Sequence, residues 1–216
     1  MYPYNSWQSS AENYKILSDI GVVGVWSYAF DKYEFTAFTD LKTYIDSKFT
    51  VNANENYQNV LNTYFTNYYG PAATKMRSMF DMIVSRCEEI ESKYDGLGRG
   101  IYDEIENVSG FIGIGAKTYW EKSWLEDLVD LCDEAIALVD ADATLTDEQK
   151  TMIKDRIIKE SLFPRYVLCT TFASKYSSSV KKQMRQEFKA DADRLGFTHY
   201  REANGSLSSL YSDWGI

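Results

Sequence analysis

Two predicted helices meet at Tyr64-Phe65-Thr66-Asn67-Tyr68-Tyr69-Gly70-Pro71-Ala72-Ala73. On either side of this corner, apolar residues recur at the three- and four-residue spacing of one helix face. The first stripe is Tyr57, Val60, Leu61, Tyr64, Phe65 and Tyr68, and the second is Met76, Met79, Phe80, Ile83, Val84, Cys87 and Ile90. Glycine tolerates the left-handed conformation just past a helix end, and proline fits the first turn of the next helix. Gly70-Pro71 therefore predicts a tight corner that aromatic rings seal.

The composition fits a mainly helical domain. The chain has 216 residues, enough for one domain with a sizeable core. Apolar stripes of helical period cover most of it, whereas a single stretch has the composition of a strand. We therefore expect a mainly α fold, a bundle of about six to seven helices with at most one or two short strands.

Capping residues and breaks in the pattern set the other expected elements. Ser9-Ser10-Ala11-Glu12 is a capping box that opens a helix ending near Ile20. Val22–Tyr28 is rich in β-branched and aromatic residues and predicts a strand. Thr146-Asp147-Glu148-Gln149 is a second capping box, and Pro164 is expected to interrupt and kink the helix that follows. The remaining expected helices are 34–48, 120–139, 166–176 and 180–195.

Charge and hydropathy exclude two classes of partner. The net charge is −9, with no basic run, so we expect no nucleic-acid partner and no binding to anionic lipid. No apolar run approaches the roughly 18 residues that a membrane span needs. Met1-Tyr2-Pro3-Tyr4 lacks the basic and apolar regions of a signal peptide. The 17 tyrosines fit either aromatic packing between helices or a surface that stacks on a flat ligand such as a sugar ring.

Cofactors and metals are not expected. Cys87, Cys132 and Cys169 lie far apart on apolar helix faces, so each is predicted to be a buried free thiol. Residues 140–144 resemble the start of a calcium loop, but leucine and threonine replace its turn glycine and its last glutamate. Residues 110–115 are glycine-rich without the order or the lysine of a phosphate-binding loop. A helix cap and a flexible turn explain these two segments better.

Catalytic residues are not assigned from the sequence. His199 is the single histidine, and no nucleophile motif accompanies it. Glycoside hydrolysis needs two carboxyl groups facing each other across a pocket, about 5 to 9 Å apart. The acidic clusters, such as Glu88-Glu89 and Asp133-Glu134, mostly fall on outward helix faces, where solvated carboxylates are the usual state.

A resemblance to a known family extends over nearly the whole chain. It is carried by Gly21-Val22-Val23-Gly24-Val25-Trp26, Phe38-Thr39-Asp40-Leu41, the Tyr64–Ala73 corner, Trp124-Leu125, Phe163-Pro164-Arg165-Tyr166-Val167 and Gly196-Phe197-Thr198. In this order they resemble the C-terminal part of the DUF4838 family, bacterial proteins, many of them from the gut, that are built like family 20 and family 67 glycoside hydrolases. The corner is the most specific of these pieces.

The resemblance implies a boundary near residue 50. In such proteins a (β/α)8 barrel precedes a helical region, so residues 1–50 would be the last βα portion of a barrel-like domain and 51–216 a C-terminal helical domain. The expected strand would be a remnant of the barrel end. A complete barrel needs about 250 residues. The acid-bearing strands are therefore expected in another part of a larger protein.

The resemblance also suggests two substrate-binding residues. The C-terminal ends of barrel strands line the active-site face, which would place Trp26 and Tyr28 beside a sugar. The alternative is that Trp26 fills the barrel core. Many relatives carry a glutamate at or beside the position of Ser27, and the serine here argues against a catalytic role for the strand.

Two functions are consistent with these observations. The first is the C-terminal helical portion of a glycoside-hydrolase-like, carbohydrate-active protein, inactive alone and, by resemblance, extracellular or in the cell envelope. The second is an independent helical module that binds a glycan or a partner protein. In both, the backbone of Val22–Tyr28 lacks barrel neighbours, so we expect it to pair with a second copy as a homodimer, to lie irregularly against the helices, or to be disordered.

Overall fold

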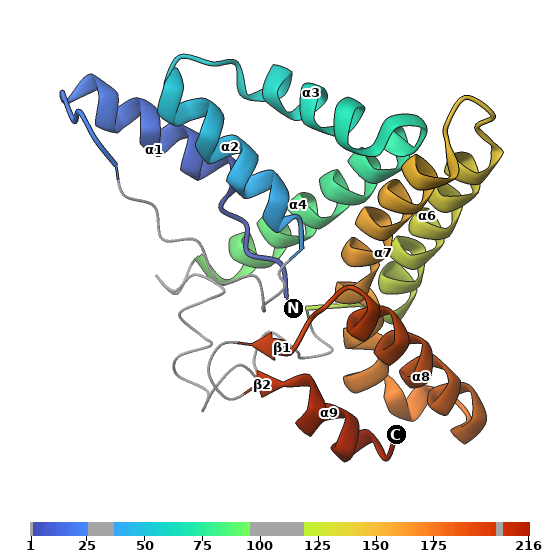
Figure 1. Ribbon diagram of the computed structural model, residues 1–216. Coiled ribbons are helices and arrows are strands. Elements are labelled where there is room, and N and C mark those ends of the chain that lie inside the picture. Colours follow the sequence, from blue (N-terminus) through green and yellow to red (C-terminus); the bar gives the residue numbers. More distant parts are fainter. Residues whose placement is uncertain (1, 26–36, 96–118, 202–204) are drawn as a thin grey trace.

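The protein is mainly helical, as the sequence predicts. The computed structural model describes residues 2–25, 37–95, 119–201 and 205–216 (Figure 1). In these ranges the long helices are α1 (Trp7–Asp19), α2 (Thr39–Val51), α3 (Tyr57–Tyr69), α4 (Ala73–Asp95), α6 (Lys122–Ala141), α7 (Asp147–Thr170) and α8 (Ser178–Arg194). A short helix α9 (Leu207–Trp214), two 3-10 turns, η1 (Gly70–Ala72) and η2 (Ala173–Lys175), and a hairpin of β1 (His199–Arg201) and β2 (Gly205–Ser206) complete them.

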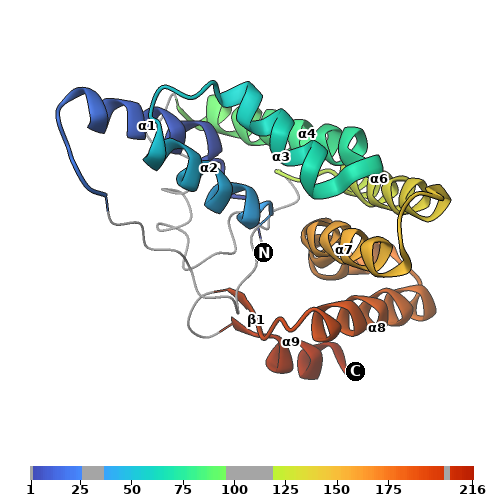
Figure 2. The same ribbon diagram turned by 45° about the horizontal axis from the view of Figure 1, so that its top comes forward.

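The helices pack around a central pair, α6 and α7. Helices α6 and α7 pack along each other, with α4 against α6 and α8 against α7 (Figure 1). Helices α1 and α2 pack as a pair at one side, and the second view shows this pair set apart from α8 and α9 (Figure 2). Within the described ranges, no helix has both the length and the apolar character needed to cross a membrane.

The predicted corner between α3 and α4 is confirmed. Gly70 ends α3 with φ 53° and ψ −120°, a conformation that glycine adopts without strain, and Pro71 is the second residue of the short turn η1. Tyr64, Phe65 and Tyr69 are buried beside it. The Phe65 and Tyr69 rings stack with centroids 5.8 Å apart, so aromatic packing seals the corner.

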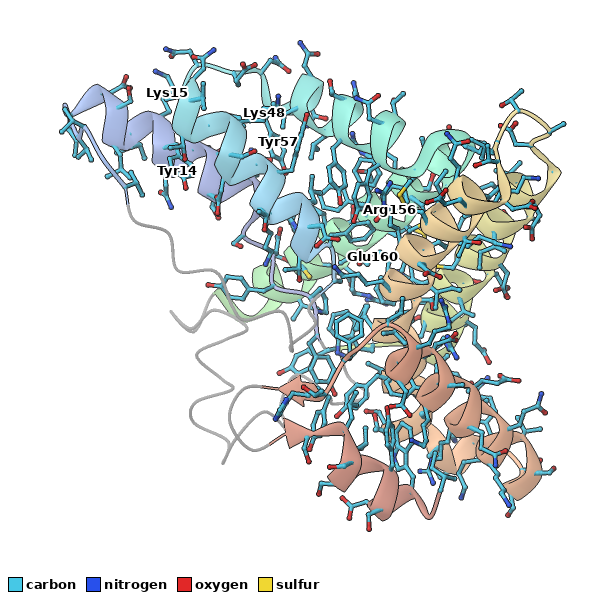
Figure 3. The ribbon with its side chains drawn as sticks, viewed as in Figure 1. Tyr14, Lys15, Lys48, Tyr57, Arg156 and Glu160 are labelled. Atoms are coloured by element: carbon cyan, nitrogen blue, oxygen red, sulfur yellow. The ribbon has the colours of Figure 1, made fainter. Side chains whose placement is uncertain are left out.

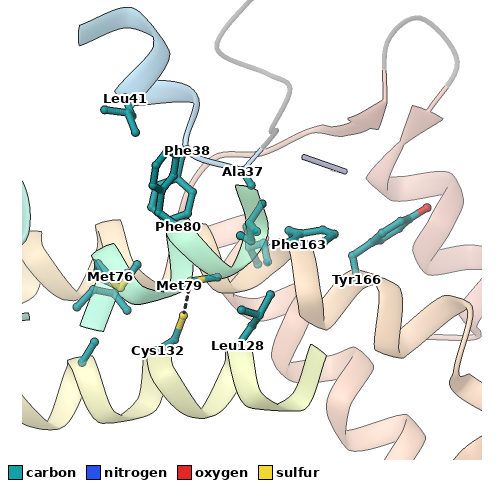
Figure 4. Close-up of a cluster of buried hydrophobic side chains, with 14 of the residues drawn as sticks. Ala37, Phe38, Leu41, Met76, Met79, Phe80, Leu128, Cys132, Phe163 and Tyr166 are labelled. Atoms are coloured by element: carbon teal, nitrogen blue, oxygen red, sulfur yellow. Dashed lines mark hydrogen bonds between the residues drawn. The ribbon is translucent and has the colours of Figure 1, made fainter. Parts of the chain in front are cut away.

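The part of the core drawn in Figure 4 lies where α4, α6 and α7 meet the start of α2. The second predicted stripe faces inward, and Met79 and Phe80 are almost completely buried. The Cys132 thiol contacts the Met79 sulfur at 3.5 Å. All three cysteines are buried free thiols, as expected.

Helix α7 corrects one expectation. The capping box is present, since the Thr146 side chain accepts from the Gln149 N–H and the Gln149 side chain from the Thr146 N–H. Pro164, however, does not interrupt the helix, which continues to Thr170. Pro164 removes the donor that the Glu160 carbonyl would use. Burial of the residues on both sides of the proline outweighs this loss.

Two helix starts and the tail also differ from the prediction. Helix α1 begins at Trp7, before the expected capping box, and its N-cap Ser6 makes no side-chain cap bond. Helix α2 begins at Thr39, and positions 34–36 of the expected helix lie outside the described residues. The β1–β2 hairpin and α9 follow residue 195, where the last expected helix ends.

Candidate functional site

The two predicted substrate-binding residues, Trp26 and Tyr28, lie outside the described residues. The described part of the expected strand, residues 22–25, is not paired in a sheet. Its N-terminal end hydrogen-bonds back to α1, because the Val22 N–H donates to the Leu17 carbonyl at 2.9 Å. Val23 is fully exposed, and Val25 is 43% exposed. This segment is therefore an exposed apolar extension of α1 up to residue 25.

A hollow opens between α1, the end of α2 and the start of α3. It has a volume of about 240 Å³. The residues that line it are Gln8, Ala11, Glu12, Lys15, Phe49, Ala53, Asn54, Glu55 and Tyr57. Lys15 and Tyr57 mark its position in Figure 3. Buried Ala11 and Phe49 form an apolar floor, and amide, carboxylate and ammonium groups surround it.

The chemistry of this hollow suits a small ligand with an apolar face and hydroxyl groups. The half-buried Tyr57 ring offers a surface for stacking, and burial raises the pKa of its hydroxyl, which stays neutral. The Gln8 amide donates to Glu12 at 2.8 Å, so these two side chains form a preformed pair of polar groups at the rim. Few polar groups around an apolar surface are typical of small-molecule sites.

A different kind of site lies beneath α2 and α3, where α7 contributes a completely buried carboxyl group, that of Glu160. Figure 3 shows Glu160 on α7 on the side that faces α2. Its Oε2 accepts a hydrogen bond of 2.7 Å from the backbone N–H of Phe38. Its Oε1 has no hydrogen-bond partner, and the same holds for the buried hydroxyls of Tyr64 and Tyr69.

Asp40 lies next to this group and has the opposite electrostatic state. Burial alone would raise the pKa of its carboxyl, but the ion pair with Lys159 at 2.8 Å and hydrogen bonds from Lys159 and Tyr68 lower it below its ordinary value. The Arg156 guanidinium stacks over the Tyr68 ring at 3.9 Å and donates to the Tyr68 carbonyl at 2.7 Å. Asp40 is thus an ionised carboxylate in a network of hydrogen bonds.

Burial has the reverse effect on Glu160 and raises the pKa of its carboxyl to about 8. The Lys159 charge and the Phe38 N–H oppose this rise, and the Asp40 charge adds to it. The two carboxyls therefore differ in protonation at neutral pH, one neutral and one ionised. Such a difference is typical of general acid–base pairs, but here the neutral member is closed off from solvent.

Arg156 and Lys159 also border an open groove along α7. The groove has a volume of about 640 Å³ and is lined by Asp147, Glu148, Thr151, Met152, Asp155, Arg156, Lys159 and Leu195. Its walls carry the acidic groups of Asp147, Glu148 and Asp155 and the basic groups of Arg156 and Lys159. The two basic groups are engaged within the protein, Lys159 with Asp40 and Arg156 with the Tyr68 carbonyl.

The other sequence candidates have structural roles where they are described. The Asp142 carboxylate accepts from the Thr144 N–H at 2.8 Å and Asp140 pairs with Lys154, which fits a helix cap rather than a calcium loop. The His199 ring contacts the Thr198 hydroxyl at 2.8 Å in the tail. Residues 110–115 lie outside the described residues.

Sequence reasoning missed Glu160. The sequence does carry a signal for its burial, namely its position on the helix. Glu160 lies three residues after Ile157 and four before Pro164, so it shares a helix face with two buried residues. A carboxyl at a core position of a helix is uncommon and marks a special environment.

Comparisons with models of known protein families, with curated proteins and with solved structures find no match for this chain.

Proposed function

We propose that this chain is the C-terminal helical portion of a glycoside-hydrolase-like, carbohydrate-active protein and is not catalytic by itself. The observation that supports this most is the exposed apolar run of Ile20, Val22, Val23 and Val25. It lies where the resemblance places the last barrel strand, whose neighbours would cover it. Exposed apolar surface of this kind typically marks a contact with another protein surface.

Assays of the purified chain on a panel of aryl-glycosides test this proposal. We expect no turnover, because the carboxyl groups of the reaction would lie on other strands of the barrel. Turnover that a single carboxylate-to-amide change abolishes would contradict the proposal. A second expectation is genomic: the open reading frame encodes several hundred further residues ahead of Met1, which would constitute the barrel.

The alternative, an independent helical module that binds a glycan, is favoured by one observation, the hollow around Tyr57. Its apolar floor and polar rim suit one sugar ring. Calorimetric titration with plant and host oligosaccharides separates the two functions, since a buttress of a barrel is expected to bind none. Binding that Tyr57→Ala weakens at least tenfold, and that Tyr4→Ala outside the hollow leaves intact, would favour the module.

Self-association through the Val22–Tyr28 segment is a further part of the proposal. The described portion, residues 22–25, presents exposed valines, so pairing with a second copy would bury these side chains. Light scattering on the chain and on a Val23→Asp variant tests it. We expect a dimer that the aspartate dissociates, and a strict monomer at all concentrations would exclude this pairing.

A further inference from the structure

The Glu160 carboxyl connects two parts of the molecule through a contact that excludes water. It lies on α7, and its hydrogen bond from the Phe38 N–H reaches the N-cap residue of α2. Phe38 is itself completely buried, and its backbone has φ 53°, in the left-handed region. Trp7 of α1 donates to the Phe38 carbonyl at 3.3 Å. One buried carboxyl thus holds the point where α1 and α2 meet the rest of the protein.

The geometry favours the neutral form of this carboxyl. An ionised Glu160 would leave Oε1 charged, buried and without a hydrogen-bond donor. The ammonium group of Lys159, which lies nearby, is already bonded to the Asp40 carboxylate at 2.8 Å. A buried charge without a partner is strongly unfavourable. A proton on Oε1 removes the charge.

We propose that Glu160 is a protonation-dependent latch: its neutral carboxyl holds the start of α2 against α7, and loss of its proton to solvent releases the α1–α2 pair from the helices behind it.

The groups around Glu160 come from four elements. They are Asp40 of α2, Tyr64, Tyr68 and Tyr69 of α3, Cys132 of α6 and Lys159 of α7. Burial raises the pKa of Cys132 and of the three tyrosines, so all four stay neutral near pH 7. The surrounding charges are then those of Asp40 and Lys159, which are paired with each other. Burial remains the dominant effect on Glu160.

The α1–α2 pair is the part that release would move. Its buried contacts with the remaining helices centre on the rings of Trp7 and Phe38. Trp7 packs on Phe80 with ring centroids 5.1 Å apart, and Phe38 packs on Phe80 at 5.3 Å and on Phe65 at 5.9 Å. Glu160, by contrast, is fixed in α7, where residues on both sides of it are buried. Water therefore reaches an ionised Glu160 most easily by separation of the start of α2 from α7.

Hydrogen exchange of the intact chain between pH 5 and 9, corrected for intrinsic rates, tests the latch. A carboxyl with a raised pKa in the closed state stabilises that state fully below its ordinary pKa and loses this effect as pH rises. We expect the opening constant of α1–α2 to rise roughly tenfold per pH unit from about pH 4.5 to 8 and then to level off. Helices α6 and α7 should keep their protection.

Glu160→Gln is the central variant, because its amide keeps an acceptor for the Phe38 N–H and cannot ionise. It should abolish the pH dependence of α1–α2 opening, whereas Glu148→Gln, an exposed carboxyl on the same helix, should leave it unchanged. A pH dependence that persists in Glu160→Gln would overturn the proposal. Equal loss of protection in α1–α2 and in α6–α7 would do the same, since it would mean global unfolding.

Two further variants keep the test decisive if Glu160→Gln fails to fold. Asp40→Asn removes a negative charge and frees Lys159, so the pH at which opening levels off should decrease. Lys159→Met removes the positive charge that favours the ionised form of Glu160, so the same pH should increase. Shifts in these opposite directions support the latch, and the absence of either shift contradicts it.

Discussion

Tyr68 shows how one hydroxyl group sets the state of a neighbouring acid. It donates to the Asp40 carboxylate at 2.5 Å, and its ring lies under the Arg156 guanidinium. Tyr64 stacks on the same ring at 4.7 Å, but its own hydroxyl has no partner. Two neighbouring tyrosines with nearly parallel rings therefore have different roles, one electrostatic and one of packing alone.

The removal of the Tyr68 hydroxyl gives a prediction with a definite pH dependence. Because the pKa of Asp40 is lowered in the folded state, its stabilising effect is present above its ordinary pKa and is lost as pH falls through the folded value. We expect Tyr68→Phe to lower the free energy of unfolding by about 1 kcal/mol at pH 6, a value reduced for the partial exposure of Asp40. The difference should shrink as the pH is lowered from 6 through the folded pKa of Asp40, which lies below its ordinary value. Urea unfolding across a series of pH values from 6 downward measures it, with Tyr14→Phe on α1 as control.

Gly70 is the residue on which the corner depends. With φ 53° and ψ −120°, it occupies a region that side chains with a Cβ rarely adopt, and an added Cβ would contact Ile153 at 3.5 Å. The contact distance is ordinary, so the cost of an alanine comes from the backbone.

We therefore expect Gly70→Ala to destabilise the protein by about 1 to 3 kcal/mol. Gly24→Ala is the matched control, because Gly24 has no neighbouring atom within 4 Å of an added Cβ and no positive φ. Thermal unfolding of the two variants measures the difference. Equal midpoints would show that the corner does not require a glycine.

At the scale of elements, side-chain caps fix where the later helices begin. Thr146 starts α7 with both bonds of a capping box, Ser177 caps α8 by accepting from the Val180 N–H, and Ser206 caps α9. Asn56 caps α3 in the same way. Helices α1, α2 and α6, in contrast, have no side-chain cap bond, and the starts of α1 and α2 differ from the prediction.

Thr146→Ala tests the worth of the capping box. It should lower the free energy of unfolding by about 1 kcal/mol, because the Gln149 N–H in the first turn of α7 loses its acceptor, the Thr146 hydroxyl. Thr43→Ala, an exposed threonine inside α2, should cost less or even stabilise, since alanine is the better helix former. A cost for Thr43→Ala as large as that for Thr146→Ala would contradict this account.

The sequence predicted elements better than it predicted the site, for a physical reason. Helical period and caps are local, so the corner at Gly70, the capping box at Thr146 and the buried thiols could all be recognised. Pro164 was misjudged because the burial of its neighbours depends on α6, far away in the chain. The pairing of Glu160 with Phe38 joins residues 122 positions apart, and no local pattern indicates it.

At the scale of the whole molecule, burial is distributed unevenly. Eleven residues of α7 are buried, among them Ile157, Phe163 and Val167, whereas α1 buries only Trp7 and Ala11. Local opening free energies generally follow such differences in buried apolar contacts. The molecule should therefore open from its edges inward, with α7 as its most stable element.

Native-state hydrogen exchange at pH 5, where the Glu160 carboxyl is neutral, tests this order. We expect the middle of α7 to exchange slowest, near the global unfolding rate, and α1 at least about a hundredfold faster.

Phe188 of α8 is completely buried against Tyr166 and Trp214. Phe188→Ala should lower the free energy of unfolding by about 3 to 5 kcal/mol. It should accelerate hydrogen exchange much more in α8 and α9 than in α3 and α4. Uniform acceleration in every helix would instead mean that the described helices unfold as one cooperative unit, and the graded order would be wrong.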